Sequence, residues 1–428
     1  MKYTAYIKGG QVPNGTVTVS GAKNSATRLL AASLISDGEV VLKNFPVELV
    51  DAKHKMNFIK NTGGDVQIDL DKEFVSINSN SLSDKSLEHY NYPIRTTYLL
   101  VPGLIKKTGS AKIPYPGGCK IGNRGYDLHI MVWEKLGAIV TEKDDYIEVN
   151  VKNGFVANEI NFPITTIGGT ETALICGSIA KGTTVIKNAY ISPEVEDLIN
   201  FLISMGVEIN VVGNSYIEVI GKHYHSGTNY HVMPDRIEAL TWLVYGILSK
   251  GNITIKDVPF HTMEIPLKHL NEAGIDFFAN KKDIYVSKNC LTNGIIQPFE
   301  LATGTHPGVI SDMQPFYVLL GLYADGKSRI YDYRYPERVK YCQELAKIYQ
   351  NAIKWSRGMI ETKNSKVDSE DFIEVESTDL RGSMALVIAA LLRKGKTKIN
   401  NVEMALRGYN NLQNKLKSLG IKIIVEES

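Results

Sequence analysis

The sequence predicts an α/β fold of two domains, built from six copies of one helix-and-strand unit. Six times along the chain, an apolar, helix-like run is followed by a glycine and a short strand-like segment. These glycines lie 69 to 75 residues apart. At 428 residues the chain exceeds what one hydrophobic core normally fills, so we expect two domains of three units each. One unit cannot bury its apolar face alone. The three units of a domain should therefore pack around shared, buried helices.

The elements of each unit follow from its pattern. After the buried helix, a glycine opens a strand, as in GTTVIKN from Gly182. A second helix then usually ends at a glycine before two alternating strands, as in LGAIVTEKDDYIEV. The fifth unit departs from this pattern, because KIYQNAIKWSRGMIE lacks the glycine and YRYPERVKYCQEL adds a proline, which indicates a remodelled loop. The expected buried helices cover 28–35, 98–105, 173–179, 242–248, 316–322 and 384–392.

The N-terminal strand, residues 5–7, comes before any helix, and we expect it to close a sheet with the far end of the chain. That pairing predicts a discontinuous domain I, residues 1–20 plus 231–428, and a domain II of residues 21–230 that carries the loop of Cys119.

Composition excludes several classes of protein. Hydrophobic residues make up 43% and charged residues 22%, as in an ordinary globular protein. The longest apolar stretch, 384–392, is too short to span a bilayer and the polar start resembles no signal peptide, so we expect a cytoplasmic protein without a membrane partner. The four cysteines have no metal-site spacing, which argues against a metal. A net charge of +2 argues against a nucleic-acid partner. The oligomeric state stays open.

Cys119 is a candidate reactive thiol. It lies in PYPGGCKIGNR, a stretch too rich in glycine for a helix, between Lys120 and Arg124. Neighbouring cations lower a thiol pKa and raise its reactivity. A loop cysteine without a role explains the pattern equally well.

Lys23 and Asn24, in VSGAKNSATRLL, follow a strand and a turn of small residues and precede the first helix. A lysine beside helix N-terminal N–H groups can form an anion site. The commoner arrangement is helix capping by Ser20 or Asn24, with a solvated lysine.

Arginine is scarce: only 11 of the 48 basic residues are arginines. Five of them occupy helix starts or loops after strands in the repeated units, so they could converge on one polyanionic ligand, with ordinary salt bridges as the alternative. Asp235 and Asp312 stand at loop-to-helix junctions, where capping is the usual role. The five arginines are Arg95, Arg124, Arg334, Arg381 and Arg407.

The six-unit period, SGAKN, PGGCKIGNR, PDRIE, SDMQ, DLR and RGY together resemble the enolpyruvyl transferases over essentially the whole chain. The resemblance implies an inside-out α/β barrel in each of two domains, which close on a sugar nucleotide and then on phosphoenolpyruvate. The implied reaction transfers the enolpyruvyl group to the 3-hydroxyl of UDP-N-acetylglucosamine and releases phosphate, without a metal or organic cofactor. This is the first step of peptidoglycan precursor synthesis, and thus belongs to cell wall biogenesis, cell shape, cell cycle and cell division.

The same resemblance implies residue roles. Asp312 would lie near the hydroxyl that loses its proton, and Cys119 would protonate the methylene or gate product release and be alkylated by fosfomycin. Phosphoenolpyruvate would be bound by Lys23, Arg95, Arg124, Arg334, Arg381 and Arg407, and the sugar nucleotide by Asn24, Arg95, Arg124, Asp127, Leu128, Ile167, Gly168 and Asp312.

The chain departs from the family pattern at the nucleotide pocket. Gly125 and Tyr126 stand where the family usually has a proline, and Ile164 where a lysine commonly contacts the nucleotide phosphates. These departures leave open a paralogue with another nucleotide or sugar acceptor. Two separate alternatives are a non-catalytic sugar-nucleotide binder and a relative of the RNA 3′-terminal phosphate cyclases.

Overall fold

The computed structural model of the chain describes residues 2–83, 96–115, 125–365 and 369–427. The described residues form two compact units. Unit 1 comprises the residues up to Ser20 and those from Pro234 onward, and unit 2 runs from Gly21 to Met233. The first break coincides with the sequence-based one, and the second lies three residues further along the chain.

Unit 1 contains three four-stranded sheets in its described residues. Their strand orders are β21 (Ile373–Glu376), β22 (Lys396–Asn400), β1 (Tyr3–Lys8), β23 (Ile424–Glu427); β15 (Phe278–Ala279), β16 (Ile284–Val286), β14 (Asn252–Lys256), β2 (Asn14–Thr18); and β17 (Glu300–Thr303), β18 (Lys327–Asp332), β20 (Met359–Lys363), β19 (Ile353–Ser356).

Unit 2 also shows three sheets in the part of the chain that is described. Their strand orders are β11 (Glu208–Val212), β12 (Tyr216–Ile220), β10 (Thr183–Lys187), β9 (Glu159–Asn161); β13 (Thr228–His231), β3 (Val40–Lys43), β5 (Phe74–Asn78), β4 (Asp65–Asp69); and β6 (Ser110–Pro114), β8 (Tyr146–Asn150), β7 (Ile139–Glu142).

Strand pairing explains why unit 1 is discontinuous. The N-terminal strand β1 pairs antiparallel with β22 and β23, as the sequence predicts. In three repeats the strand before a buried helix pairs parallel with the strand after it: β9 with β10, β17 with β18 and β21 with β22. At the unit breaks this partnership is exchanged, because β2 pairs with β14 and β13 pairs with β3. The segment before Ser20 therefore belongs with the C-terminal half of the chain.

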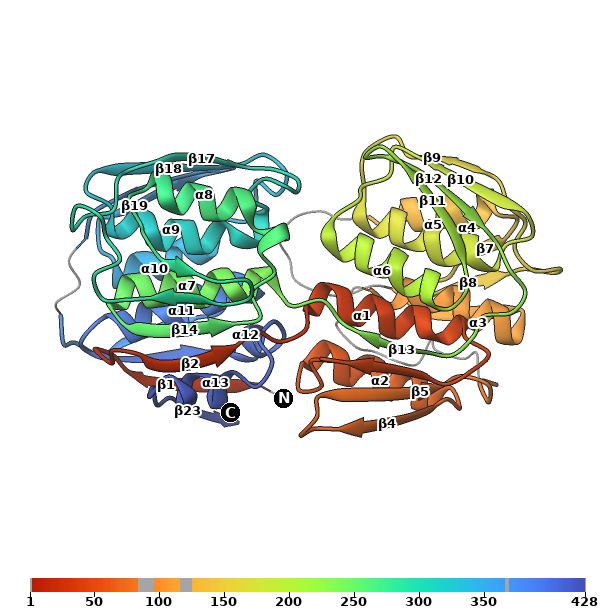
Figure 1. The fold of residues 1–428 in the computed structure, drawn as a ribbon, viewed down its shortest axis with the longest axis horizontal. Coiled ribbons are helices and arrows are strands. Elements are labelled where there is room, and N and C mark those ends of the chain that lie inside the picture. The colour runs from red at the N-terminus through yellow and green to blue at the C-terminus, as the bar shows by residue number, and fades with distance from the viewer. Residues whose placement is uncertain (1, 84–95, 116–124, 366–368, 428) are drawn as a thin grey trace. The chain divides into compact units, whose positions relative to one another are not determined.

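The helices form an inner and an outer set in each unit, with the inner set enclosed by the sheets (Figure 1). The inner helices begin two to six residues before the predicted apolar runs, because their first turns carry polar residues. The inner set is α1 (Lys23–Ala32) with η1 (Ser33–Ile35), η2 (Thr96–Leu100) with α3 (Val101–Thr108), and α5 (Ile167–Ile179) in unit 2, and α7 (Arg236–Ser249), α9 (Gln314–Tyr323) and α11 (Leu380–Leu392) in unit 1. The outer set is α2 (Val50–Asn61), α4 (Asp127–Lys135), α6 (Pro193–Ser204), α8 (Glu264–Glu272) after η3 (Phe260–Thr262), α10 (Tyr341–Ile348), α12 (Glu403–Leu406) and α13 (Leu412–Ser418).

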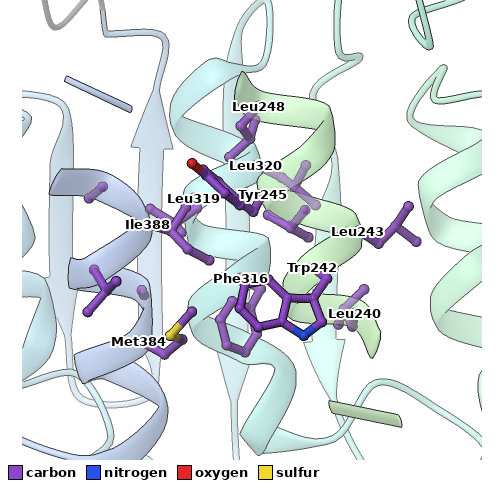
Figure 2. Close-up of a cluster of buried hydrophobic side chains, with 14 of the residues drawn as sticks. Leu240, Trp242, Leu243, Tyr245, Leu248, Phe316, Leu319, Leu320, Met384 and Ile388 are labelled. Carbon is purple, nitrogen blue, oxygen red and sulfur yellow. The ribbon is translucent and has the colours of Figure 1, made fainter. Parts of the chain in front are cut away.

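The inner helices of unit 1 pack on one another through large apolar side chains. Trp242 of α7, Phe316 of α9 and Met384 of α11 are fully buried and meet in one cluster (Figure 2). Every residue of α7 from Arg236 to Leu248 is buried. A helix that is apolar on all sides requires such an environment. The prediction of buried helices inside each domain is confirmed.

The fifth repeat keeps its turn without the glycine. Asn351 adopts a left-handed φ of 59° after α10. In the third repeat, Gly206 occupies the corresponding turn after α6, with a φ of 93°. Asparagine is the residue that best tolerates this conformation after glycine. The hairpin of β19 and β20 therefore forms as in the other repeats.

The inner helices of unit 2 end at a shared cluster of charged groups. Lys106 Nζ, at the end of α3, lies 2.6 Å from Ile35 O, 2.6 Å from Asp37 Oδ2 and 2.9 Å from His225 Nδ1. His225 Nε2 lies 3.0 Å from the carbonyl of Ser178. Because an ammonium only donates and a carbonyl only accepts, the imidazole is neutral and carries its proton on Nε2. The cluster therefore joins the C-terminal ends of η1, α3 and α5.

We expect unit 2 to lose stability in mild acid. Burial, followed by the charge of Lys106, lowers the pKa of His225 to about 4. Unfolded His225 titrates near its ordinary value of about 6.5, so between these values the unfolded state binds a proton that the folded state excludes, and stability falls as pH falls, by up to about 3 kcal/mol. Asp37 also makes the stability of unit 2 fall as pH falls, but at lower pH. Its partial burial would raise its pKa, but hydrogen bonds, first from Lys106, lower it to about 2.

Urea unfolding followed through Trp133, a buried residue of α4, measures this effect once Trp242 and Trp355 are replaced by Phe. His225→Gln removes the titration but can still donate to Ser178 O, and it should flatten the pH dependence between pH 6.5 and 4. An unchanged slope in this variant would contradict the assignment.

No helix within the described ranges has the length and apolar character to cross a bilayer.

Candidate active site

Three aspartates stand where the inner helices of unit 1 begin. Asp235 caps α7 by accepting the backbone N–H groups of Ile237 and Glu238 at 2.8 and 3.1 Å. Asp379 caps α11 in the same way, through Arg381 N and Gly382 N at 3.1 Å each. Capping is therefore confirmed for Asp235.

Asp312 behaves differently. It lies in η4 (Ser311–Met313) before α9, and neither η4 nor α9 has a side-chain cap. Its side chain is 28% exposed, whereas those of Asp235 and Asp379 are 5% and 6% exposed. The capping interpretation is wrong for Asp312, which directs its carboxylate to arginines instead.

Two buried arginines connect the three aspartates. Arg338 Nη1 lies 2.6 Å from Asp312 Oδ1, and Nη2 lies 3.2 Å from Asp379 Oδ1. Arg381 Nε lies 3.6 Å from Asp312 Oδ2, and its Nη2 lies 3.8 Å from Asp235 Oδ2. Burial alone would lower the pKa of Arg338, but the charges of Asp312 and Asp379 outweigh it and raise that pKa. Both guanidiniums are permanently charged, and they are desolvated beside the starts of three helices, a setting that favours anions.

The RGY segment packs on Arg381. Arg381 Nη1 lies 3.4 Å from Gly408 O, and its guanidinium lies 5.1 Å from the centre of the Tyr409 ring. Arg407, which ends α12, is 8% exposed and is the neighbour of Gly408 in the chain. The structure thus brings the Arg407 segment and Arg381 together with Asp312. Arg334 is half-buried above the ring of Tyr335, at 6.0 Å, in the same segment as Arg338.

In unit 2, Lys23 is the first residue of α1. The capping residue is Ala22, which supplies no side-chain hydrogen bond, so neither Ser20 nor Asn24 caps the helix. Lys23 Nζ lies 3.2 Å from Asp51 Oδ2, and the two side chains are 16% and 12% exposed. Lys23 is therefore paired and largely buried, and the interpretation as a solvated charge is wrong.

The four remaining residues of the predicted nucleotide set occupy two helix starts in unit 2. Asp127 and Leu128 open α4, and Ile167 and Gly168 open α5. His129 lies between them: its ring stacks on Tyr98 at 3.5 Å, and its Nδ1 lies 2.7 Å from Thr172 Oγ1 of α5. An ideal Cβ on Gly168 would lie 2.9 Å from His129 Cε1, so only glycine fits against this ring.

Cys119, Arg95 and Arg124 lie outside the described residues. Sequence reasoning missed Arg338 and His129, although Arg338 is one of only 11 arginines and His129 follows two predicted ligands directly. The described residues contain no group of three or more His, Cys, Asp or Glu side chains arranged to hold a metal ion.

Comparison with known proteins identifies the class. The fold is shared with the enolpyruvyl transferase NikO from Streptomyces tendae (TM-score 0.87, 22% identity, 100% of this chain and 99% of that chain). It is also shared with the EPSP synthase from Acinetobacter baumannii (TM-score 0.74, 16% identity, 100% of both chains). The two-domain α/β fold predicted from the repeats is that of the enolpyruvyl transferases.

The family model of EPSP synthase (3-phosphoshikimate 1-carboxyvinyltransferase) matches residues 7–416. The chain therefore belongs to this family of enzymes. It is 33% identical over 424 residues to the UDP-N-acetylglucosamine 1-carboxyvinyltransferase of Sulfurovum sp. (strain NBC37-1), covering 98% of each protein. It is 34% identical over 426 residues to the protein of the same name from Methylocella silvestris, covering 97% of each. The resemblance inferred from the sequence motifs is confirmed.

Proposed function

We propose that the protein transfers the enolpyruvyl group of phosphoenolpyruvate to the 3-hydroxyl of UDP-N-acetylglucosamine and releases phosphate. The observation that carries the proposal is the cluster of Asp312, Arg338 and Arg381, which places a partly exposed carboxylate beside buried cations. Near-full-length relatives named for this reaction support the choice of substrates. The reaction would place the protein in the cytoplasm, at the start of peptidoglycan synthesis, with a part in cell wall biogenesis, cell shape and cell division.

The chemistry requires one base, one acid and several cations. Protonation of the methylene carbon leaves an oxocarbenium-like carbon, which the acceptor hydroxyl attacks while giving up its proton to Asp312. The resulting ketal loses a proton from the new methyl group and loses phosphate, so the enol ether and inorganic phosphate form without net oxidation. Preorganised guanidiniums stabilise the anionic groups throughout.

We assign roles to the other residues in the same proposal. Cys119 delivers the proton to the methylene, or gates product release, and is the thiol that fosfomycin alkylates. The sugar nucleotide contacts Asn24, Asp127, Leu128, Ile167, Gly168 and Asp312, with Arg95 and Arg124. Phosphoenolpyruvate contacts Lys23, Arg95, Arg124, Arg334, Arg381 and Arg407.

Phosphate release by the purified protein, with phosphoenolpyruvate and UDP-N-acetylglucosamine, tests the proposal. Cys119→Ala should abolish time-dependent inactivation by fosfomycin, because the alkylated sulfur is gone. Cys119→Asp should also resist fosfomycin but keep turnover, since a carboxyl group can still deliver a proton. Cys290→Ala, at a buried thiol of unit 1, is the matched control and should stay sensitive. No phosphate release with any acceptor would refute the proposal.

One observation favours a second candidate function, enolpyruvyl transfer to a different acceptor. Ile164 is apolar and 63% exposed at a position where the family commonly has a lysine that contacts nucleotide phosphates. An acceptor with fewer phosphate charges would not need that cation. Turnover with a nucleoside monophosphate, and none with UDP-N-acetylglucosamine, would select this candidate. Tight binding of UDP-N-acetylglucosamine without any turnover would instead indicate a non-catalytic binder.

A further inference from the structure

Arg338 is the buried cation that makes the shorter contact with Asp312. It lies between β18 and α10, and its side chain is 3% exposed. One terminal nitrogen, Nη1, contacts Asp312 Oδ1 at 2.6 Å and Ser311 Oγ at 3.3 Å. The other, Nη2, contacts Asp379 Oδ1 at 3.2 Å. Each arm of the guanidinium thus holds a different carboxylate.

We propose that Arg338 is a positioning residue, which fixes the carboxylate of Asp312 in the orientation needed to take the proton of the acceptor hydroxyl. The inference rests on the proposed function, in which Asp312 accepts that proton. It adds to that function a residue that touches neither substrate and acts through Asp312.

No helix cap orients the carboxylate of Asp312. Asp235 and Asp379 are each held by two backbone N–H groups at their own helix starts. Asp312 has no such cap in η4 or α9. A carboxylate that is partly exposed and not used as a cap would sample several rotamers unless a side chain held it. The contact with Arg338 Nη1 supplies that restraint.

Arg338 is itself held in place by the segment that carries it. Asp332, which ends β18, accepts the N–H groups of Arg334 and Tyr335 at 3.2 and 2.8 Å and so shapes the segment that leads to Arg338. The same carboxylate accepts Ser311 Oγ–H at 2.5 Å, next to Asp312. One buried residue therefore fixes both the arginine and the residue that precedes its target. Such a supporting shell is what a precisely placed catalytic group requires.

Arg338 also affects the charge around Asp312. Asp312 contacts the cations Arg338 and Arg381, which also contact the carboxylates Asp379 and Asp235, and its neighbour Ser311 contacts the carboxylate of Asp332. Removing Arg338 takes away the shorter cation contact and leaves the carboxylates in place. An opposite charge within 4 to 6 Å typically lowers a carboxyl pKa by about 1 to 3 units, so its loss should raise the pKa of Asp312.

The experiment compares Arg338→Met and Arg338→Lys with wild type in phosphate release. Arg338→Met should lower kcat about 100-fold, because a misplaced base loses its alignment, and should change the KM for phosphoenolpyruvate less than threefold. The acid limb of its rate profile should move up by about 1 pH unit or more. Arg338→Lys keeps the positive charge but lacks the planar guanidinium with its two terminal nitrogens. It should return the acid limb to its wild-type pH but recover only part of the wild-type kcat. Arg329→Met, at an exposed ion pair of β18, is the matched control and should leave both unchanged.

Arg338→Met also leaves Asp379 buried without its cation, which could prevent folding. Arg338→Met with Asp379→Asn removes that charge while asparagine keeps the cap of α11, and this variant should fold and show a loss of kcat similar to that of Arg338→Met. A folded variant whose kcat and acid limb match wild type would overturn the inference and leave the proposed function intact. Wild-type protein without phosphate release on any acceptor would overturn both.

Discussion

Asp312→Asn should lower kcat for phosphate release by about 100-fold to 10,000-fold, the range that a general base usually contributes. Asparagine has the shape of aspartate and can stay beside Arg338, but it cannot accept the hydroxyl proton. Neither η4 nor α9 has a side-chain cap, so replacing Asp312 should not uncap α9. We therefore expect the loss to appear in kcat, with the melting temperature close to that of wild type.

A matched substitution distinguishes the effect of losing the base from the effect of losing one negative charge in unit 1. Asp325→Asn changes an exposed aspartate in the turn before β18 and should leave kcat unchanged. If Asp312→Asn retains more than a third of the wild-type kcat, the hydroxyl proton goes to another group, and the assignment of Asp312 as the base is wrong.

The repeat made most of the fold predictable, because six copies of one pattern reinforce one another. The predicted helix starts lie C-terminal to the observed ones, and the reason is physical. Apolar periodicity marks the part of a helix that faces the core, whereas the first turns of α5 and α7 carry polar residues that the surrounding structure also buries. Burial of Arg236 and Glu238 depends on tertiary contacts, which a local pattern does not record.

The sequence indicated which residues form the candidate site better than it indicated which of them contact one another. Arg334 and Arg338 lie four residues apart in one irregular segment, and only the path of the chain decides which one faces Asp312. Arg338 N bonds to Tyr335 O at 2.9 Å, and Gly358 N bonds to Pro336 O at 2.8 Å, so the segment folds back on itself and buries Arg338. No periodic signal in the sequence specifies that turn.

The same limit applies to Lys23, whose surroundings in unit 2 come from distant parts of the chain. Asp51 and Lys55 belong to α2, and Glu171 belongs to α5. Lys55 is fully buried, with Nζ 2.6 Å from Thr27 O, and Arg28 Nε lies 3.0 Å from Glu171 Oε1. These residues form a charge cluster behind the first turns of α1. Stable placement of Lys23 depends on the balance of charge in this cluster.

Glu171→Ala should destabilise unit 2 by about 3 to 5 kcal/mol, the usual cost of removing one partner from a buried ion pair. Glu171 is 1% exposed, and its loss leaves Arg28 beside the buried Lys55. Burial, followed by the charge of Arg28, already lowers the pKa of Lys55 well below its ordinary range. The free energy of unfolding is measured in urea through Trp133, with Trp242 and Trp355 replaced by Phe.

Glu196→Ala on α6 is the matched control, since Glu196 is exposed on the same unit and its loss should change stability by less than about 0.5 kcal/mol. Adding Arg28→Met to Glu171→Ala removes the uncompensated cation and should recover part of the lost stability, because replacing both members of a buried pair costs less than replacing one. If Glu171→Ala costs less than about 1 kcal/mol, then the buried cations of α1 and α2 are stabilised by groups other than Glu171, and the charge balance proposed for Lys23 does not hold.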